Sequence, residues 1–155
     1  MKNFSAFTHG GTLCLSKAGL AEGTNANTLK IAAPNGAGVD YAIDGLLYHK
    51  ADVDNIAITA CAVQADLTSC LYLVSLNAAG TVTITKGEEA LTASLGVGRE
   101  SLRWPEVPAG NCPIGGFRVD NSGGTFTSGT TDLGAATVTD TYYDFSLVPP
   151  APLIA

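Results

Sequence analysis

Side chains that could carry out catalysis are few in this sequence. Its two imidazoles are His9 and His49, and the chain has no GxSxG motif that would present a nucleophilic serine. A nucleophilic site needs a base beside a serine or cysteine. His49 instead ends the first predicted hairpin, close to Lys50 and Asp52, which favours a solvated or hydrogen-bonded structural histidine. The carboxylates Glu88 and Glu89 are adjacent, as in a solvated loop rather than a glycosidase pair. We expect no enzyme activity.

Motifs for metal or phosphate binding are incomplete. The stretch DVDN brings together Asp52, Asp54 and Asn55 as a calcium loop does, but the next position is apolar and no glycine follows, so a turn explains it better. The glycine-rich stretch GVGRES, at 96–101, lacks the third glycine of a dinucleotide-binding loop and does not open a helix after a strand. The sequence therefore predicts neither a metal site nor a cofactor.

The cysteines are spaced too widely for a CxxC motif. We expect reduced, buried thiols that pack as small apolar side chains, and a Cys61–Cys70 disulfide is the alternative. The four cysteines are Cys14, Cys61, Cys70 and Cys112.

Composition limits the partners of the protein. Charged residues make up only 14% of the 155 residues, the formal net charge is −6, and the eight Lys and Arg are scattered. A nucleic-acid-binding protein would show a basic patch, so we expect no contact with DNA or RNA. No apolar run approaches the length of a membrane span or of a secretory signal, which predicts a protein made in a cytoplasm and no membrane partner. So few charges predict that partner proteins cover part of the surface.

Two hairpins are predicted from alternation and turn residues. Residues 39–43 alternate, Asp44 and Gly45 provide the positive-φ pair of a type I′ turn, and LLYHK returns as the second strand. Residues 71–77 and 81–85 flank the turn AAG, with one face of the hairpin predicted to be buried and the other solvated.

Further elements are assigned from shorter patterns. We expect strands at 55–60, 114–119 and 141–147, a turn of helix near 63–67, and either a short helix or a loop at 88–95. Frequent turns without a βαβ rhythm predict an all-β fold, an antiparallel β-sandwich or a jelly-roll-like barrel.

Both ends differ from the middle of the chain. Residues 1–27 are small and polar, and residues 148–155, VPPAPLIA, are rich in proline and cannot join a sheet. We expect a β domain over 28–147 with extended N- and C-terminal arms, frayed ends being the alternative. The apolar end of the C-terminal arm favours docking on a neighbour.

The stretch from Arg103 to Gly124 is predicted to be a shaped crossover between strands. Trp104 and Pro105 cannot continue a central strand, PAG makes a turn, and Gly115 and Gly116 permit a bulge or a close backbone approach. The candidate interface residues are Trp104, Pro105, Val148, Pro149, Pro150, Pro152, Leu153 and Ile154.

Three segments, at 41–89, 103–121 and 130–147, carry motifs such as AGTVT and PEVPAGNCPIG. In these segments the chain resembles small virion structural proteins of tailed bacteriophages, most of all the head proteins that decorate or cement capsids. The resemblance covers about residues 39–147 and leaves the N-terminal arm out.

The resemblance implies a function without catalysis. A decoration protein binds the outer surface of the shell at junctions of the major capsid protein, and a homotrimer is the expected state, with a dimer as the alternative. The protein would then be part of the virion, on the capsid exterior. A rival interpretation is a carbohydrate- or receptor-binding module of a tail spike or fibre, in which Trp104 and the loop at 121–132 form the contact surface.

Overall fold

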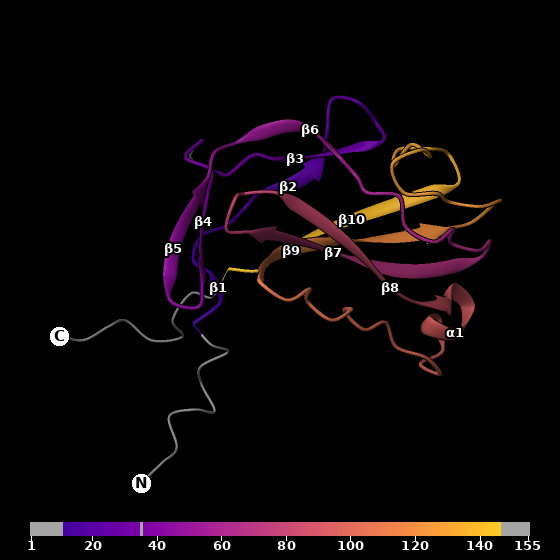
Figure 1. The fold of residues 1–155 in the computed structure, drawn as a ribbon. Helices are drawn as coiled ribbons and strands as arrows, with labels where there is room; N and C mark the ends of the chain where they lie inside the picture. Colours follow the sequence, from indigo (N-terminus) through magenta and orange to yellow (C-terminus); the bar gives the residue numbers. More distant parts are fainter. Residues whose placement is uncertain (1–10, 35, 147–155) are drawn as a thin grey trace, which may run out of the picture.

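Ten strands and one short helix form the part of the chain described by this computed structural model, residues 11–34 and 36–146 (Figure 1). The strands lie in three sheets, and every pairing is antiparallel. The elements are β1 (Leu13–Cys14), β2 (Leu20–Glu22), β3 (Thr28–Ile31), β4 (Val39–Ile43), β5 (Leu46–Lys50), β6 (Val53–Ala57), β7 (Thr68–Asn77), β8 (Val82–Leu91), α1 (Thr92–Gly96), β9 (Asn111–Asn121) and β10 (Val138–Asp144).

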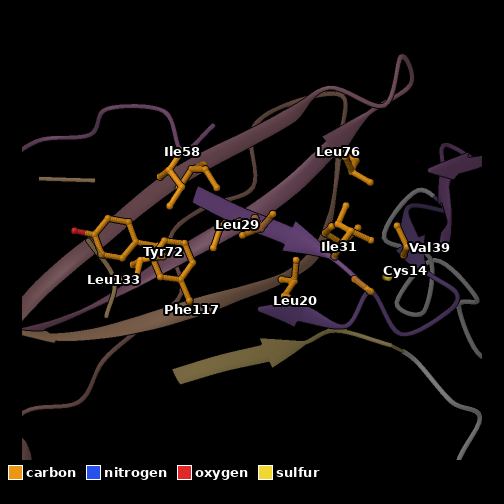
Figure 2. Close-up of a cluster of buried hydrophobic side chains, with 14 of the residues drawn as sticks. Cys14, Leu20, Leu29, Ile31, Val39, Ile58, Tyr72, Leu76, Phe117 and Leu133 are labelled. Carbon is orange, nitrogen blue, oxygen red and sulfur yellow. The ribbon is translucent and has the colours of Figure 1, made fainter. Parts of the chain in front are cut away.

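The predicted all-β sandwich is confirmed. A four-stranded sheet, in the order β10-β9-β7-β8, packs through one face against the sheet β2-β3-β6, and the sheet β1-β4-β5 stands at one end of the molecule (Figure 1). Leu29 of β3 lies towards Tyr72 of β7 and Phe117 of β9, whereas Ile31 lies towards Val39 (Figure 2). The rings of Tyr72 and Phe117 stack with centroids 4.9 Å apart, so aromatic contacts fill the middle of this core.

The first hairpin forms as predicted. Strands β4 and β5 pair from Val39 with Lys50 to Ile43 with Leu46. Asp44 and Gly45 both have positive φ, 51° and 82°, which is the geometry of a type I′ turn.

The second hairpin also forms, but its predicted solvated face is wrong for β7. Tyr72 and Val74 point into the sandwich core, while the alternate residues Leu71 and Leu73 are buried on the opposite side of the sheet. Pairing with both β8 and β9 places β7 inside the sheet. The chain segment between α1 and β9 covers the outer face.

Several short elements differ from their predicted positions. The strand expected at 55–60 occupies Val53–Ala57, the helix expected within 88–95 is confined to Thr92–Gly96 because β8 continues to Leu91, and the last strand is Val138–Asp144. The predicted turn of helix at 63–67 is wrong. Its backbone is extended at Gln64, which forms a bridge with Phe126.

The structure describes residues 11–27 of the N-terminal arm that was predicted at 1–27, and two strands occupy part of this range. Strand β1 pairs with β4 and β2 pairs with β3, so the β domain begins well before residue 28. Isolated apolar residues in a glycine-rich segment make two short strands here, and Cys14 and Leu20 are buried in the core. The C-terminal arm at 148–155 lies outside the described residues, and within them no helix is long and apolar enough to cross a membrane.

Candidate functional site: an apolar end beside the crossover

The crossover between α1 and β9 covers the outer face of the four-stranded sheet. Trp104 meets Tyr143 and Phe145 edge-on, with ring centroids 5.7 and 4.8 Å away. Gly116 makes this contact possible, because a Cβ at that position would overlap the Trp104 ring. Leu73 lies beside Gly116 in the sheet, so the crossover also closes off this leucine from solvent. The predicted close approach at Gly116 is confirmed.

Trp104 and Pro105 are thus packing residues with exposed edges. The Trp104 side chain keeps 37% of its exposure, and Pro105 lies against β8 at Gly87. Trp104 contacts Phe145, and Phe145 lines a groove that the sequence did not indicate.

This groove has a volume of about 560 Å³ and lies between the end of the crossover and β1. Among the described residues no charged side chain lines it, and most of its surface is apolar. Its walls are formed mainly by Leu13, Val107, Pro108, Ala109, Pro113 and Phe145. The spaced prolines of PEVPAGNCP were the available signal, but Phe145 and Leu13 are distant in sequence and only the fold brings them here.

The tip of the β4–β5 hairpin continues the apolar surface. Leu46 and Leu47 are 64% and 74% exposed. The turn is tied to the chain beside the groove: Gly45 N–H donates to the Gly11 carbonyl over 3.2 Å, and Asp44 N–H donates to Thr12 Oγ1 over 3.1 Å. We call the groove together with Leu46 and Leu47 the apolar end.

A second group of exposed apolar residues lies near α1, at the opposite end of the four-stranded sheet. Thr92 N–H donates to the Leu67 carbonyl over 3.0 Å and joins the two segments that carry the group. Its exposed members are Leu67, Leu91 and Val97.

The turn predicted at DVDN is wrong: residues 53–55 belong to strand β6, and the side chains of Asp54 and Asn55 instead hold the turn between β2 and β3. Asp54 accepts hydrogen bonds from the backbone N–H and hydroxyl of Thr24, and Asn55 Oδ1 accepts from Asn25 N–H over 2.8 Å. The hydroxyl and backbone of Thr24 keep the pKa of Asp54 below its ordinary value. Asp52 instead accepts from Ala33 N–H, and no group of three metal-ligating side chains occurs among the described residues.

Other candidate chemical groups are tied into local contacts. His49 lies opposite Asp40 in the first hairpin, with its Nδ1 2.8 Å from Asp40 Oδ1, and both are exposed. Glu89 binds Lys86 and accepts from Ala65 N–H and the Thr68 hydroxyl. Burial would raise the pKa of Glu89, but these hydrogen bonds and the Lys86 charge outweigh it and lower the pKa.

All four cysteines are free, so the Cys61–Cys70 alternative is not formed. Three of them are buried and Cys61 is half-buried. Burial raises the pKa of Cys70 and Cys112 to about 11 and that of Cys14 to about 12. Thiols with such values are poor nucleophiles, and they pack as small apolar side chains.

A buried polar network was missed by the sequence analysis. Gln64 is fully buried, and its Nε2 donates to the carbonyls of Thr68 and Val119 over 2.9 and 3.1 Å. Its Oε1 accepts from the Tyr72 hydroxyl over 3.0 Å. Since a buried amide must find partners, this network fixes the segment that was expected to be helical and explains its extended backbone.

Of the eight candidate interface residues, the structure places Trp104 and Pro105 on the crossover, and the other six lie outside the described residues. The site that can be described is therefore the apolar end, which presents shape and apolar area rather than reactive groups. Comparison of the chain with models of protein families, with curated proteins and with solved structures found no match.

Proposed function

We propose that this protein is a capsid decoration protein of a tailed bacteriophage, which binds the outer surface of the major capsid protein lattice and stabilises the head without catalysis. The observation that carries the proposal is the apolar end, where a hairpin with two exposed leucines is hydrogen-bonded to the chain beside an apolar groove. The sequence motifs that resemble virion proteins support the same assignment.

The apolar end has the properties of a binding surface. Burying exposed apolar area contributes roughly 25 cal/mol per Å², and anchors of this kind dominate binding when they enter a pocket on the partner. Leu46 and Leu47 follow a type I′ turn and pair in β5, so their backbone is already ordered and binding costs mainly side-chain entropy. A shell lattice offers many identical sites, and simultaneous contacts from one oligomer would raise the overall affinity.

Binding to expanded, undecorated capsids tests the proposal. We expect the purified protein to cosediment with them in saturable, stoichiometric amounts. The double variant Leu46→Ser/Leu47→Ser should weaken binding at least tenfold, because it removes apolar area without touching the core. The matched control, Leu91→Ser/Val97→Ser, makes the same kind of change at the opposite end and should bind normally. Absence of binding by the wild-type protein, or equal loss in both variants, would contradict the proposal.

A carbohydrate- or receptor-binding module of a tail spike or fibre is the second candidate. The observation that favours it is the pair Trp104 and Tyr143, which contact each other and both keep exposed surface, 37% and 39%. Aromatic faces of this kind bind sugars. Retention on a host-polysaccharide column that is lost in Tyr143→Ser, together with no capsid binding, would favour this candidate over decoration.

A further inference from the structure

We propose that the groove of the apolar end binds the C-terminal segment, residues 148–155, of a second copy of this chain. The proposal concerns self-association and does not depend on capsid binding. The proposed ligand of the groove is a peptide segment of known sequence.

The walls of the groove suit an apolar, proline-rich peptide. Pro108, Pro113 and Phe145 line it together with Leu13 and Val107, and the lining residues that the structure describes include no charged side chain. Grooves built from aromatic and proline side chains bind extended proline-rich segments, because such segments lose little entropy on binding. A volume of about 560 Å³ holds several aliphatic side chains.

The sequence of residues 148–155 matches those walls. VPPAPLIA has no charged side chain and contains three prolines. Proline has no N–H to donate, so this segment is a poor partner for an exposed strand edge and must bind through its side chains. Leu153 and Ile154 are the largest apolar side chains in it and the natural anchors.

The point where the chain leaves the fold favours a second copy over the chain's own groove. Phe145 forms part of the groove wall, and its N–H donates to the Ile114 carbonyl over 3.0 Å. Residue 148 follows the wall residue Phe145 by only three positions, so a segment that filled its own groove would need a tight turn next to that wall. Pro149 and Pro150 then bias the chain towards an extended course, against such a turn.

The reach of the segment is sufficient for exchange between copies. Eight residues in polyproline geometry span about 25 Å at roughly 3.1 Å per residue. Reciprocal exchange would close a dimer, and exchange in one direction around a ring would close a trimer. Each assembly fills every groove with one tail.

Sedimentation equilibrium of full-length protein tests the inference. We expect a dimer or trimer for the wild-type chain and monomers for two variants: Ala109→Glu, which places a charge in the groove, and a deletion of residues 148–155. The control Ala136→Glu puts the same charge on an exposed turn remote from the groove and should associate as the wild-type does. Far-UV circular dichroism checks that each variant is folded.

Mixing the two monomeric variants gives the sharpest result. The deleted chain keeps an open groove and the Ala109→Glu chain keeps its tail, so a 1:1 mixture should form a heterodimer. Leu153→Asp/Ile154→Asp provides a second tail variant that leaves the length unchanged, and it should be monomeric.

Three outcomes would overturn the inference: a monomeric wild-type chain, wild-type association in both tail variants, or a mixture that stays monomeric. A wild-type chain that is monomeric but whose Trp104 fluorescence changes on tail deletion would show that the tail binds its own groove, since Trp104 contacts Phe145 of the groove wall. Capsid binding by a monomeric wild-type chain would leave the decoration proposal standing while this inference fails.

Discussion

Strands β7 and β5 both belong to hairpins that the sequence predicts in the same way, and they end in opposite environments. In β7 nine of ten residues are buried, including Leu73 at 1% exposure. In β5 no residue is buried, and Leu47 keeps 74% of its exposure. The difference arises from neighbours. β7 lies between two strands with a sheet over one face and the crossover over the other, whereas β5 is the edge of a three-stranded sheet.

The residues of β7 therefore stabilise the fold, whereas those of β5 remain accessible to solvent. An exposed apolar edge strand risks aggregation, and proteins protect such edges with charge. Here His49 and Lys50 occupy one end of β5, whereas Leu46 and Leu47 at the other end are exposed. The proposed capsid contact uses these two surface leucines.

Truncating one leucine in each strand should give the largest difference. We expect Leu73→Ala to lower the free energy of unfolding by about 2–5 kcal/mol, because it opens a cavity beneath the crossover. Leu47→Ala should change it by less than about 0.5 kcal/mol, as for other exposed positions. Urea unfolding, followed by circular dichroism, measures both. Similar losses in the two variants would mean that β5 is as well covered as β7 in solution.

The crossover's role is tested by its tryptophan. Trp104→Ala should cost about 1–3 kcal/mol of stability, less than a fully buried tryptophan, because about a third of the side chain is exposed. Trp104→Phe should retain part of the packing against Tyr143 and Phe145 and lose less. If Trp104→Ala unfolds at the wild-type urea concentration, the crossover does not stabilise the outer face of β7.

The reactivity of the thiols should also distinguish buried from partly exposed positions, with a smaller effect than the leucine variants. At pH 8 a thiol reagent should modify Cys61 first, and Cys14, Cys70 and Cys112 only after denaturation, because burial raises their pKa values to about 11–12. Cys61→Ser should abolish the native-state reaction. Fast modification of two or more thiols in the folded protein would contradict the burial of these residues.

The pH dependence of stability has a definite sign for these thiols. An unfolded thiol ionises near its ordinary value of 9.0, whereas the folded Cys70 keeps its proton to about 11. The unfolded state therefore loses protons first, and the stabilising contribution present below pH 9 declines as the pH rises towards 11. Cys70→Ala should make this alkaline decline shallower.

Much of the fold could be predicted because local signals agreed with the final structure. Asp44-Gly45 fixed the first turn through its backbone preference, and the run at 71–77 indicated a strand. The double burial of that strand was not predicted, although its nearly continuous apolar run is typical of a strand covered on both faces. The alternation of Val82 and Ile84 in the partner strand suggested a solvated face instead.

The apolar end could not be predicted because it is assembled from distant residues. Leu13, Val107 and Phe145 meet only through the pairing of β1 with β4 and the path of the crossover. The extended backbone at Gln64 depended on Tyr72 and Val119 in the same way. In each case a long-range contact outweighed the local propensity on which sequence analysis relies.

The sheet order β10-β9-β7-β8 also has a consequence for biosynthesis. On the ribosome β7 and β8 can pair at once, but β9, which must cover the free edge of β7, emerges only after the crossover. At about 5–20 residues per second the nascent chain exposes an apolar, half-paired strand for a few seconds. High expression levels and elevated temperature should therefore favour inclusion bodies, and slower synthesis in the cold should improve the yield of folded protein.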